Sequence, residues 1–271
     1  MDKAIFFEDV KHLPEGVPTT FQWLAANGIN GLQLDEREIY DFGEENMRAA
    51  LQAAGLGASV IHYLPRFLSD DSALFEEAVA HSLRAMALCE RMGCKRLMVV
   101  PLPREDVKGR EDLPRARESM IAGIRRILPE AARRGITLYF ENFSTELLPY
   151  GTAEDAEAIL AACPEIRYCF DTGNYHCTRQ NVAETFARLA PRTTMLHAKC
   201  FADSAEQTHI RCDDGGYVRG VPFGEGAVGV PEILAAAGQY PNIEIITVEH
   251  NAALTREELD RSLRTLNACF A

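Results

Sequence analysis

The sequence predicts an α/β protein with the (β/α)8 arrangement of a TIM barrel. Eight short apolar segments rich in β-forming residues alternate with eight segments of helical period. The repeat averages about 34 residues over the 271 residues of the chain, which is typical of this fold. A doubly wound sheet is the alternative, but it usually has fewer strands, and no G-x-G-x-x-G motif follows the first one.

The predicted strands are runs of four to eight residues in which apolar and β-branched side chains dominate. In chain order they cover residues 3–8, 31–35, 58–64, 96–101, 136–142, 167–172, 194–199 and 243–249.

The predicted helices carry apolar residues at helical spacing, with start and stop signals at their ends. They cover residues 19–26, 45–54, 71–92, 115–134, 152–162, 182–189, 231–238 and 255–269. Thr152 and Thr255 each precede acidic residues, as N-cap residues do. Gly28, Gly55 and Gly93 lie between a helix and a strand, where a C-cap glycine is expected, and Gly135 does the same.

Composition and charge narrow the class of protein. We expect a single domain over residues 1–271, because no linker or low-complexity segment divides the chain. The formal net charge of −12 argues against binding to nucleic acid or to anionic membranes. No apolar run reaches the length of a membrane span, and no signal peptide is evident, so a cytoplasmic protein is expected. The eight cysteines lack C-x-x-C spacing and are expected to be free thiols.

The last four predicted strands each end on an ionisable residue. These are Glu141, Asp171, His197 and Glu249. Because side chains alternate along a strand, each of the four lies on the face opposite the Leu, Phe, Ile and Val residues that suit packing under outer helices. The carboxyl ends of barrel strands form the active-site face of this fold. We therefore expect the four side chains to converge at the barrel mouth.

Three converging carboxylates repel one another, and a bound cation would remove that conflict. A single acid at a strand end can simply cap the next helix, but four in phase on consecutive strands are hard to explain in that way. Two glutamates, one aspartate and one histidine suit one divalent ion of the Mn²⁺, Mg²⁺, Co²⁺ or Zn²⁺ type. The sequence thus predicts Glu141, Asp171, His197 and Glu249 as metal ligands.

These strand ends resemble the xylose isomerase-like sugar isomerases and epimerases. The resemblance rests on ENF at 141–143, DTGN at 171–174, HAK at 197–199, FGEGAVGVPEIL at 223–234 and VEH at 248–250. It implies a metal-dependent barrel that acts on a ketose, a keto acid or a polyol, with the same four residues as ligands. In the epimerase branch it also implies that Glu141 and Glu249 form the catalytic acid/base pair. Several relatives have a substrate-binding histidine where this chain has Asn174. Asn174 is therefore a candidate for substrate contact, and His176, two residues further on, is a possible substitute for the histidine.

The predicted reaction moves a proton on a carbon next to a carbonyl, through an enediolate. Proton return from the opposite face gives an epimerase, and return to the neighbouring carbon gives an aldose–ketose isomerase. An inosose-type dehydratase and a hydroxypyruvate isomerase remain open, since they could use the same barrel. A nuclease is disfavoured by the acidic charge, and a non-catalytic sugar or metal sensor by the presence of both glutamates. The predicted partner is a small sugar or polyol, and a homo-oligomer is possible.

Other residues are weaker candidates for substrate contact. His62 ends the third strand, where it could touch substrate or be a core histidine, and Gln33 is a candidate for hydroxyl binding. Lys199 could bind a substrate oxygen or pair with Asp171 or Asp203. The polar segment 201–223 is expected to be a lid or contact loop, in which Arg211 or Arg219 could bind an anionic group. The glycines at 224, 226 and 229 could cradle an oxyanion or simply form a turn.

Overall fold

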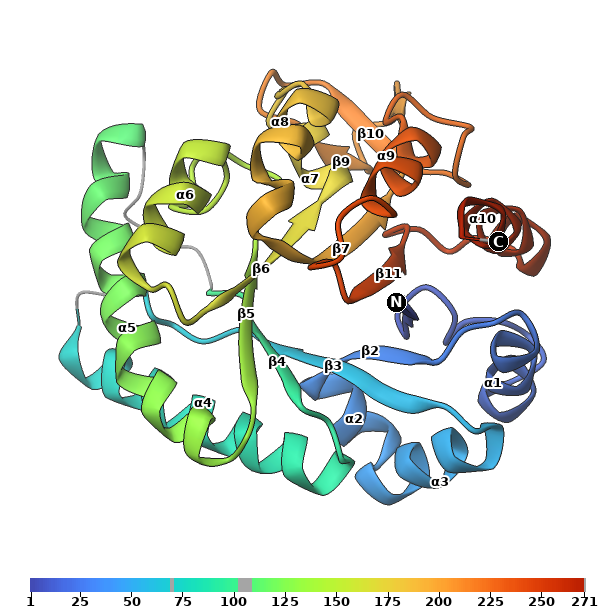
Figure 1. Cartoon of the computed structure of the whole chain (residues 1–271), viewed down its shortest axis with the longest axis horizontal. Helices are drawn as coiled ribbons and strands as arrows, with labels where there is room; N and C mark the ends of the chain where they lie inside the picture. The colour runs from blue at the N-terminus through green and yellow to red at the C-terminus, as the bar shows by residue number, and fades with distance from the viewer. Residues whose placement is uncertain (69–70, 102–108, 271) are drawn as a thin grey trace.

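Eight parallel strands close into a barrel in the computed structural model, which describes residues 1–68, 71–101 and 109–270. Their order around the barrel is β1-β11-β7-β6-β5-β4-β3-β2, as Figure 1 shows in part. The barrel strands are β1 (Asp2–Phe6), β2 (Gly31–Asp35), β3 (Gly57–Tyr63), β4 (Arg96–Val99), β5 (Thr137–Glu141), β6 (Arg167–Asp171), β7 (Thr193–Lys199) and β11 (Ile245–Glu249). The predicted fold class is confirmed.

Helices surround the barrel (Figure 1). They are α1 (Val17–Ala26), α2 (Glu36–Phe42), α3 (Glu44–Ala54), α4 (Ser72–Met92), α5 (Leu113–Arg133), α6 (Ala153–Ala162), α7 (Thr172–Cys177), α8 (Val182–Leu189), α9 (Val230–Ala237) and α10 (Arg256–Cys269). Short 3-10 turns, η1 (Arg110–Asp112) and η2 (Ala190–Arg192), precede α5 and β7. Among the described residues, no helix combines the length and the apolar content that crossing a bilayer requires.

The predicted strands and helices lie within about two residues of the observed ones, but α2 and α7 were not predicted. Both are too short for a helical period to be recognised. Helix α2 follows β2 without a break, because Asp35 ends the strand and forms a capping box with Glu38. Helix α7 likewise begins at Asp171, whose side chain accepts a hydrogen bond from the backbone N–H of Asn174. In both places the residue that ends the strand also caps a helix.

Two separate layers of apolar side chains hold the barrel together. The first layer is a small cluster inside the barrel, which consists of Ala4, Val60, Met98, Val100, Tyr139, Cys169, Met195 and Ile245. The second layer fills the space between the strands and the helices, and it includes Phe140, Phe170, Leu196 and Val248. Inner and outer residues therefore alternate along β5, β6, β7 and β11, as the sequence predicts. All eight cysteines are free, and seven of them are buried.

The segment that we expected to be a polar loop after β7 forms a small antiparallel sheet instead. Its strands are β8 (Phe201–Ser204), β9 (Ile210–Arg211) and β10 (Tyr217–Gly220), in the order β8-β10-β9. Strand β8 starts one residue after β7, and the chain returns to the barrel where Val221 N–H donates to Cys200 O. Asp213 accepts hydrogen bonds from Thr145 Oγ1 and from Glu146 N–H. These attachments make the segment a docked element.

Glycines permit two close backbone approaches to this sheet, one from the end of β11 and one from the loop before α9. A Cβ atom at Gly220 would lie 1.9 Å from the carbonyl oxygen of His250, which directly follows β11. A Cβ atom at Gly226 would lie 2.3 Å from the carbonyl oxygen of Phe201. Gly224 adopts a φ of 86°. The glycine-rich segment is therefore explained by turn geometry and tight backbone packing.

We predict that Gly220→Ala lowers the free energy of unfolding by about 2 kcal/mol, because the new methyl group forces the backbone of β10 away from that of His250. Urea unfolding followed by circular dichroism measures the change. Gly57→Ala is the matched control, since no atom lies within 4 Å of its added Cβ and its φ is not positive. Equal stability of the two variants would show that the sheet can shift without cost.

Candidate metal centre and substrate cavity

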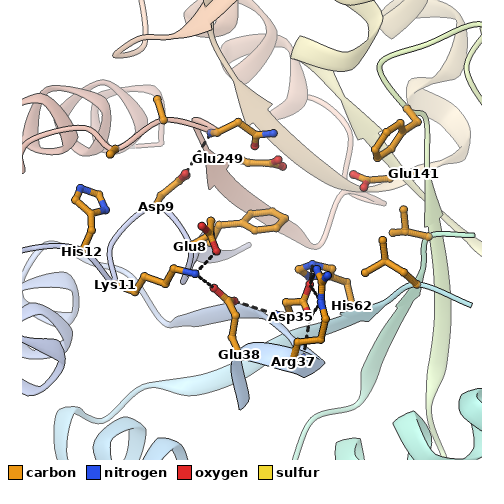
Figure 2. A pocket seen from close by; sticks show the side chains of 17 residues that line it. Glu8, Asp9, Lys11, His12, Asp35, Arg37, Glu38, His62, Glu141 and Glu249 are labelled. Carbon is orange, nitrogen blue, oxygen red and sulfur yellow. Dashed lines mark hydrogen bonds and ion pairs between the residues drawn. The ribbon is translucent and has the colours of Figure 1, made fainter. Parts of the chain in front are cut away.

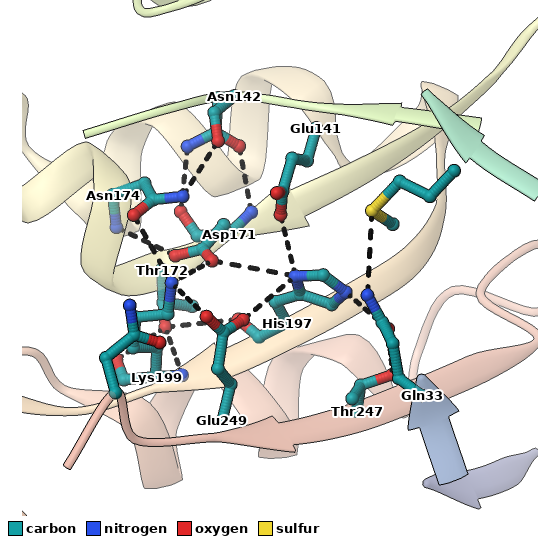
Figure 3. Close-up of polar contacts among 12 residues, drawn as sticks. Gln33, Glu141, Asn142, Asp171, Thr172, Asn174, His197, Lys199, Thr247 and Glu249 are labelled. Carbon is teal, nitrogen blue, oxygen red and sulfur yellow. Dashed lines mark hydrogen bonds and ion pairs between the residues drawn. The ribbon is translucent and has the colours of Figure 1, made fainter. Parts of the chain in front are cut away.

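Four ionisable side chains meet at the carboxyl ends of the barrel strands. Glu141 ends β5, Asp171 ends β6, His197 lies on β7 and Glu249 ends β11. Each offers one ligand atom, and these four atoms all lie within 4.8 Å of one another. The register explains part of this convergence, because Asp171 pairs with His197 across β6 and β7. Figure 3 shows the four side chains pointing toward a common centre. The arrangement agrees with the convergence that side-chain alternation predicts.

His197 Nδ1 is the centre of this cluster. It lies 2.8 Å from Glu141 Oε2, 3.1 Å from Glu249 Oε2 and 3.6 Å from Asp171 Oδ2. All four atoms are buried, and none makes a hydrogen bond among the described residues, although Asp171 Oδ2 forms an ion pair with Lys199. Buried polar atoms without a partner are rare, and several in one place indicate an ion. Three carboxylate oxygens and one imidazole nitrogen fit a divalent cation.

Gln33 orients the imidazole ring of His197. Its Oε1 atom lies 2.9 Å from His197 Nε2 and also accepts a hydrogen bond from Thr247 Oγ1. Because Gln33 Oε1 can only accept, the ring presents N–H at Nε2 and turns Nδ1 toward the carboxylates. Sequence reasoning suggested Gln33 for hydroxyl binding, but its contacts are with His197, Thr247 and the sulfur of Met98. Burial lowers the pKa of His197, but Cys169, Glu141 and Asp171 outweigh burial and hold that pKa well above its ordinary value.

Asn142, the residue after Glu141, holds the strand end that carries Asp171. Its Oδ1 atom accepts from Asp171 N–H at 2.8 Å and from the Tyr168 hydroxyl at 2.9 Å, and its Nδ2 atom donates to Asp171 O at 3.0 Å. Asp171 then divides its two oxygens. Oδ1 accepts from Asn174 N–H and caps α7, whereas Oδ2 faces His197. The predicted substrate residue Asn174 therefore lies behind Asp171, where its Nδ2 atom donates to Asn142 O.

Lys199 offsets part of the negative charge of the carboxylates. Its Nζ atom lies 2.6 Å from Glu249 Oε1 and 2.8 Å from Asp171 Oδ2, and it donates to Asn174 Oδ1 at 3.3 Å. The ion pair with Asp171 was one of the two that the sequence suggested. Three oxygens occupy the three donors of the buried ammonium group, so none is left for a substrate. Burial raises the pKa of Glu249, but Lys199 and His197 outweigh it and lower that pKa to about 2.

A cavity of about 550 Å³ opens above the cluster. Glu141 and Glu249 line it, together with His62, as expected from the third strand. Figure 2 shows the two glutamates across the cavity from a group of charged residues. Those residues are Glu8 and Lys11 after β1, Asp35 at the end of β2, and Arg37 and Glu38 on α2, whereas Asp9 lies beside Glu249. Phe6, Leu64, Val100 and Phe143 supply apolar surface. The volume is that of a small-molecule site.

Ion pairs connect the charged wall of this cavity. Lys11 pairs with Glu8 and Glu38, and Arg37 pairs with Asp35, whose Oδ2 atom also lies 3.3 Å from His62 Nε2. Burial and hydrogen bonding with Glu8 raise the pKa of Glu38 to about 7. The charge of Glu38 is therefore expected to change near neutral pH.

Three other predicted substrate residues do not line this cavity. His176 lines a different cavity, between α8 and α9. Arg211 lies on β9 and is exposed, and Arg219 lies on β10, where it lines a neighbouring cavity of about 520 Å³. Both arginines were expected on a loop that could fold over the mouth. The small sheet holds them to one side instead.

A buried row of polar residues beside Glu249 was not predicted. Asp9 accepts hydrogen bonds from the backbone N–H groups of His250 and Asn251, and His250 Nε2 lies 2.8 Å from Ser262 Oγ. The row joins the loop after β1, the end of β11 and helix α10, and so fixes the backbone that carries Glu249. The histidine that follows Glu249 in VEH could have indicated such a row. Its partners, however, are 241 and 12 residues away in the sequence, so no local pattern identifies them.

Comparison with known proteins agrees with the barrel fold. A family model described as a xylose isomerase-like TIM barrel matches residues 21–269. A search of the curated proteins returned no match. The solved structure of the probable 3-DHS dehydratase AsbF from Bacillus anthracis is 16% identical, with a TM-score of 0.77 over 98% of this chain and 99% of that chain.

Two further solved structures are also similar in fold. The IolI protein with a bound zinc atom is 14% identical, with a TM-score of 0.73 over 100% of this chain and 96% of that one. The 3-keto-D-glucoside 4-epimerase YcjR from E. coli is 15% identical, with a TM-score of 0.70 over 100% and 99%. At such identities the structures establish a shared fold.

We predict that Gln33→Leu weakens Mn²⁺ binding about 10- to 100-fold, because His197 loses the acceptor that directs Nδ1 toward the carboxylates. Isothermal titration calorimetry measures the affinity. Gln52→Leu, on the exposed face of α3, is the control and should bind Mn²⁺ as the unmodified protein does. Unchanged affinity in a folded Gln33→Leu variant would contradict the orienting role.

We also predict that Glu38 makes the protein less stable as the pH rises. Its pKa is raised from 4.5 to about 7, so the folded state binds a proton that the unfolded state has lost between these values. Stability therefore falls as the pH rises through this window. Between pH 5 and pH 8, the unfolding free energy of Glu38→Gln should rise by about 1 kcal/mol relative to the unmodified protein. Glu76→Gln, on the exposed face of α4, should show no such change.

Proposed function

The chain belongs to the xylose isomerase-like TIM barrel family, and we propose that it is a divalent-metal-dependent sugar isomerase or epimerase. Its reaction is proton transfer at a carbon next to a carbonyl. One observation carries the proposal: four buried ligand atoms, of which only Asp171 Oδ2 has a cationic partner outside the cluster, converge at the floor of a cavity that two of the ligand residues also line.

Glu141, Asp171, His197 and Glu249 are the residues that would hold the cation. A bound divalent cation supplies positive charge that stabilises the negative charge developing on the oxygens of a hydroxy-carbonyl substrate, and so acidifies the C–H bond between them. Lys199 and Gln33 keep the ligands in position through the contacts described above. Both lie below the cavity and do not line it.

Glu141 and Glu249 are the proposed acid/base pair. They reach the cavity from β5 and β11, which are separated in the barrel by β6 and β7. A carboxylate oxygen on one side of the substrate takes up the proton. For epimerisation, the second carboxyl returns a proton from the other side, and for isomerisation a proton returns to the neighbouring carbon. His62, held by Asp35, is the proposed contact for a substrate hydroxyl.

The relatives support a sugar-like substrate and leave one alternative. YcjR is named as a 3-keto-D-glucoside 4-epimerase, and another structure of 14% identity and TM-score 0.70 is a D-psicose 3-epimerase studied with D-fructose. AsbF is named as a probable dehydratase, so an inosose-type dehydratase is the second candidate. A dehydratase begins with the same proton removal and then expels water. A hydroxypyruvate isomerase on the same barrel is a further variant.

The deciding experiment is incubation with Mn²⁺ and a panel of ketoses, inososes and hydroxypyruvate in D₂O, followed by NMR. We expect solvent deuterium at one carbon next to the carbonyl of the true substrate. Loss of water would favour the dehydratase. Absence of deuterium across the panel, in protein that binds Mn²⁺, would contradict the proposal.

We predict that Glu141→Gln and Glu249→Gln each lower kcat about 10³-fold or more, because each removes a proton-transfer group. Glu76→Gln is the control and should keep full activity. Dialysis against EDTA should abolish turnover, and added Mn²⁺ should restore it. Wild-type rates in both glutamine variants, or activity that survives removal of the metal, would refute this mechanism.

A further inference from the structure

We propose that the cavity selects uncharged polyhydroxy carbonyl compounds and excludes their phosphorylated and carboxylated counterparts. This inference rests on the proposed function and specifies its substrate class. It starts from the charged side chains that line the cavity, six of which are carboxylates and only two of which are cations.

Both cations are already paired with carboxylates. Lys11 Nζ contacts Glu8 Oε2 and lies 3.0 Å from Glu38 Oε1. The Arg37 guanidinium lies against Asp35 in a two-pronged pair, with Nε 2.9 Å and 3.1 Å from the two carboxylate oxygens. Figure 2 shows both pairs on the wall that faces Glu141 and Glu249. A phosphate that approached either cation would also meet the carboxylate that is already paired with it.

The remaining basic groups near the cavity are also occupied or directed elsewhere. Lys199 has three oxygen partners below the floor. His62 Nε2 lies 3.3 Å from Asp35 Oδ2, so only its Nδ1 atom, which has no hydrogen-bond partner among the described residues, is left for a substrate hydroxyl. Arg219 belongs to the neighbouring cavity, which it lines together with Glu258. Anion-binding sites in proteins present unpaired donors, such as an arginine fork or free backbone N–H groups. Among the described lining residues, the lysine and the arginine both have carboxylate partners, and His12 Nε2 lies 2.8 Å from Leu254 O.

The same wall suits hydroxyl groups. Carboxylates accept hydrogen bonds, and a sugar hydroxyl is both a donor and an acceptor. Glu8, Asp35 and Glu38 are ion-paired acceptors within one wall of the cavity. A negatively charged substituent beside them would meet like charge. One such pair about 8 Å apart near a protein surface corresponds to a roughly 30-fold loss of affinity. The wall therefore accepts a polyol and opposes its phosphate ester.

Glu8 offers a way to test this wall without touching the metal ligands. It lies on the loop after β1, its side chain is 61% exposed, and its partner in the structure is Lys11. Glu8→Lys should leave Lys11 with one carboxylate partner and add a second cation beside it. Glu76→Lys introduces the same change of charge on exposed α4 and serves as the control.

The experiment compares D-fructose with D-fructose 6-phosphate on the Mn²⁺-loaded protein, by calorimetry for binding and by deuterium exchange for turnover. We expect the neutral sugar to be favoured by about 30-fold or more. Glu8→Lys should shift this ratio about tenfold toward the phosphate, whereas Glu76→Lys should not change it. Added salt should weaken the discrimination, since screening reduces repulsion between exposed charges. Inorganic phosphate should compete poorly with the sugar.

The results separate the two proposals. Equal or tighter binding of the phosphate ester, or strong competition by inorganic phosphate, would overturn the selectivity inference and leave the proposed function standing. Absence of deuterium exchange with both sugars and with the wider ketose panel would count against the proposed function. The binding ratio would still decide the selectivity in that case, because it does not depend on turnover.

Discussion

The organisation of this protein depends on an electrostatic conflict at the floor of the barrel mouth. Three carboxylates converge on His197 Nδ1 in a buried space, where mutual repulsion and lost hydration both cost free energy. Lys199 offsets part of that charge from one side, through Asp171 and Glu249. The ion pairs of Lys199 do not include Glu141. The cluster is therefore best explained as a candidate cation site. The surrounding residues keep its carboxylates close together despite their mutual repulsion.

The ligand side chains are held in position by polar residues whose own hydrogen bonds are made to neighbouring residues in the barrel. Gln33 accepts a hydrogen bond from Thr247 and contacts His197 Nε2. The side chain of Asn142 hydrogen-bonds to both the backbone N–H and the backbone carbonyl of Asp171. Each of these partners comes from a different strand, so the orientation of the ligands is determined by the closed barrel as a whole. Preorganisation of this kind lets charge stabilisation act without rearrangement during a reaction. The row from Asp9 through His250 extends the same principle to the backbone at the end of β11.

The two halves of the barrel contribute different chemistry to the cavity. Strands β5, β6, β7 and β11 carry the proposed ligands, whereas the ends of β1, β2 and β3 carry ion pairs that face the substrate space. The first set would be shared by enzymes that use a common proton-transfer step. The second set, with Lys11 and Arg37 each paired with carboxylates, is where discrimination among substrates can arise. The small sheet after β7 adds a third element, which is docked on the barrel and holds Arg211 and Arg219 aside.

The sequence alone determined the barrel and the convergence of Glu141, Asp171, His197 and Glu249, because both follow from local rules: the strand–helix repeat, period-two alternation and the position of a residue at a strand end. Tertiary structure decided what those rules cannot express. Gln33 and His197 are 164 residues apart, and their contact exists only because the barrel closes. Packing between distant segments likewise determines which residues pair with Lys199. It also places His176 in a different cavity and makes a small sheet of the segment that was expected to be a loop. These contacts depend on the free energy of packing between segments that are far apart in the sequence, and local sequence patterns carry no information about it.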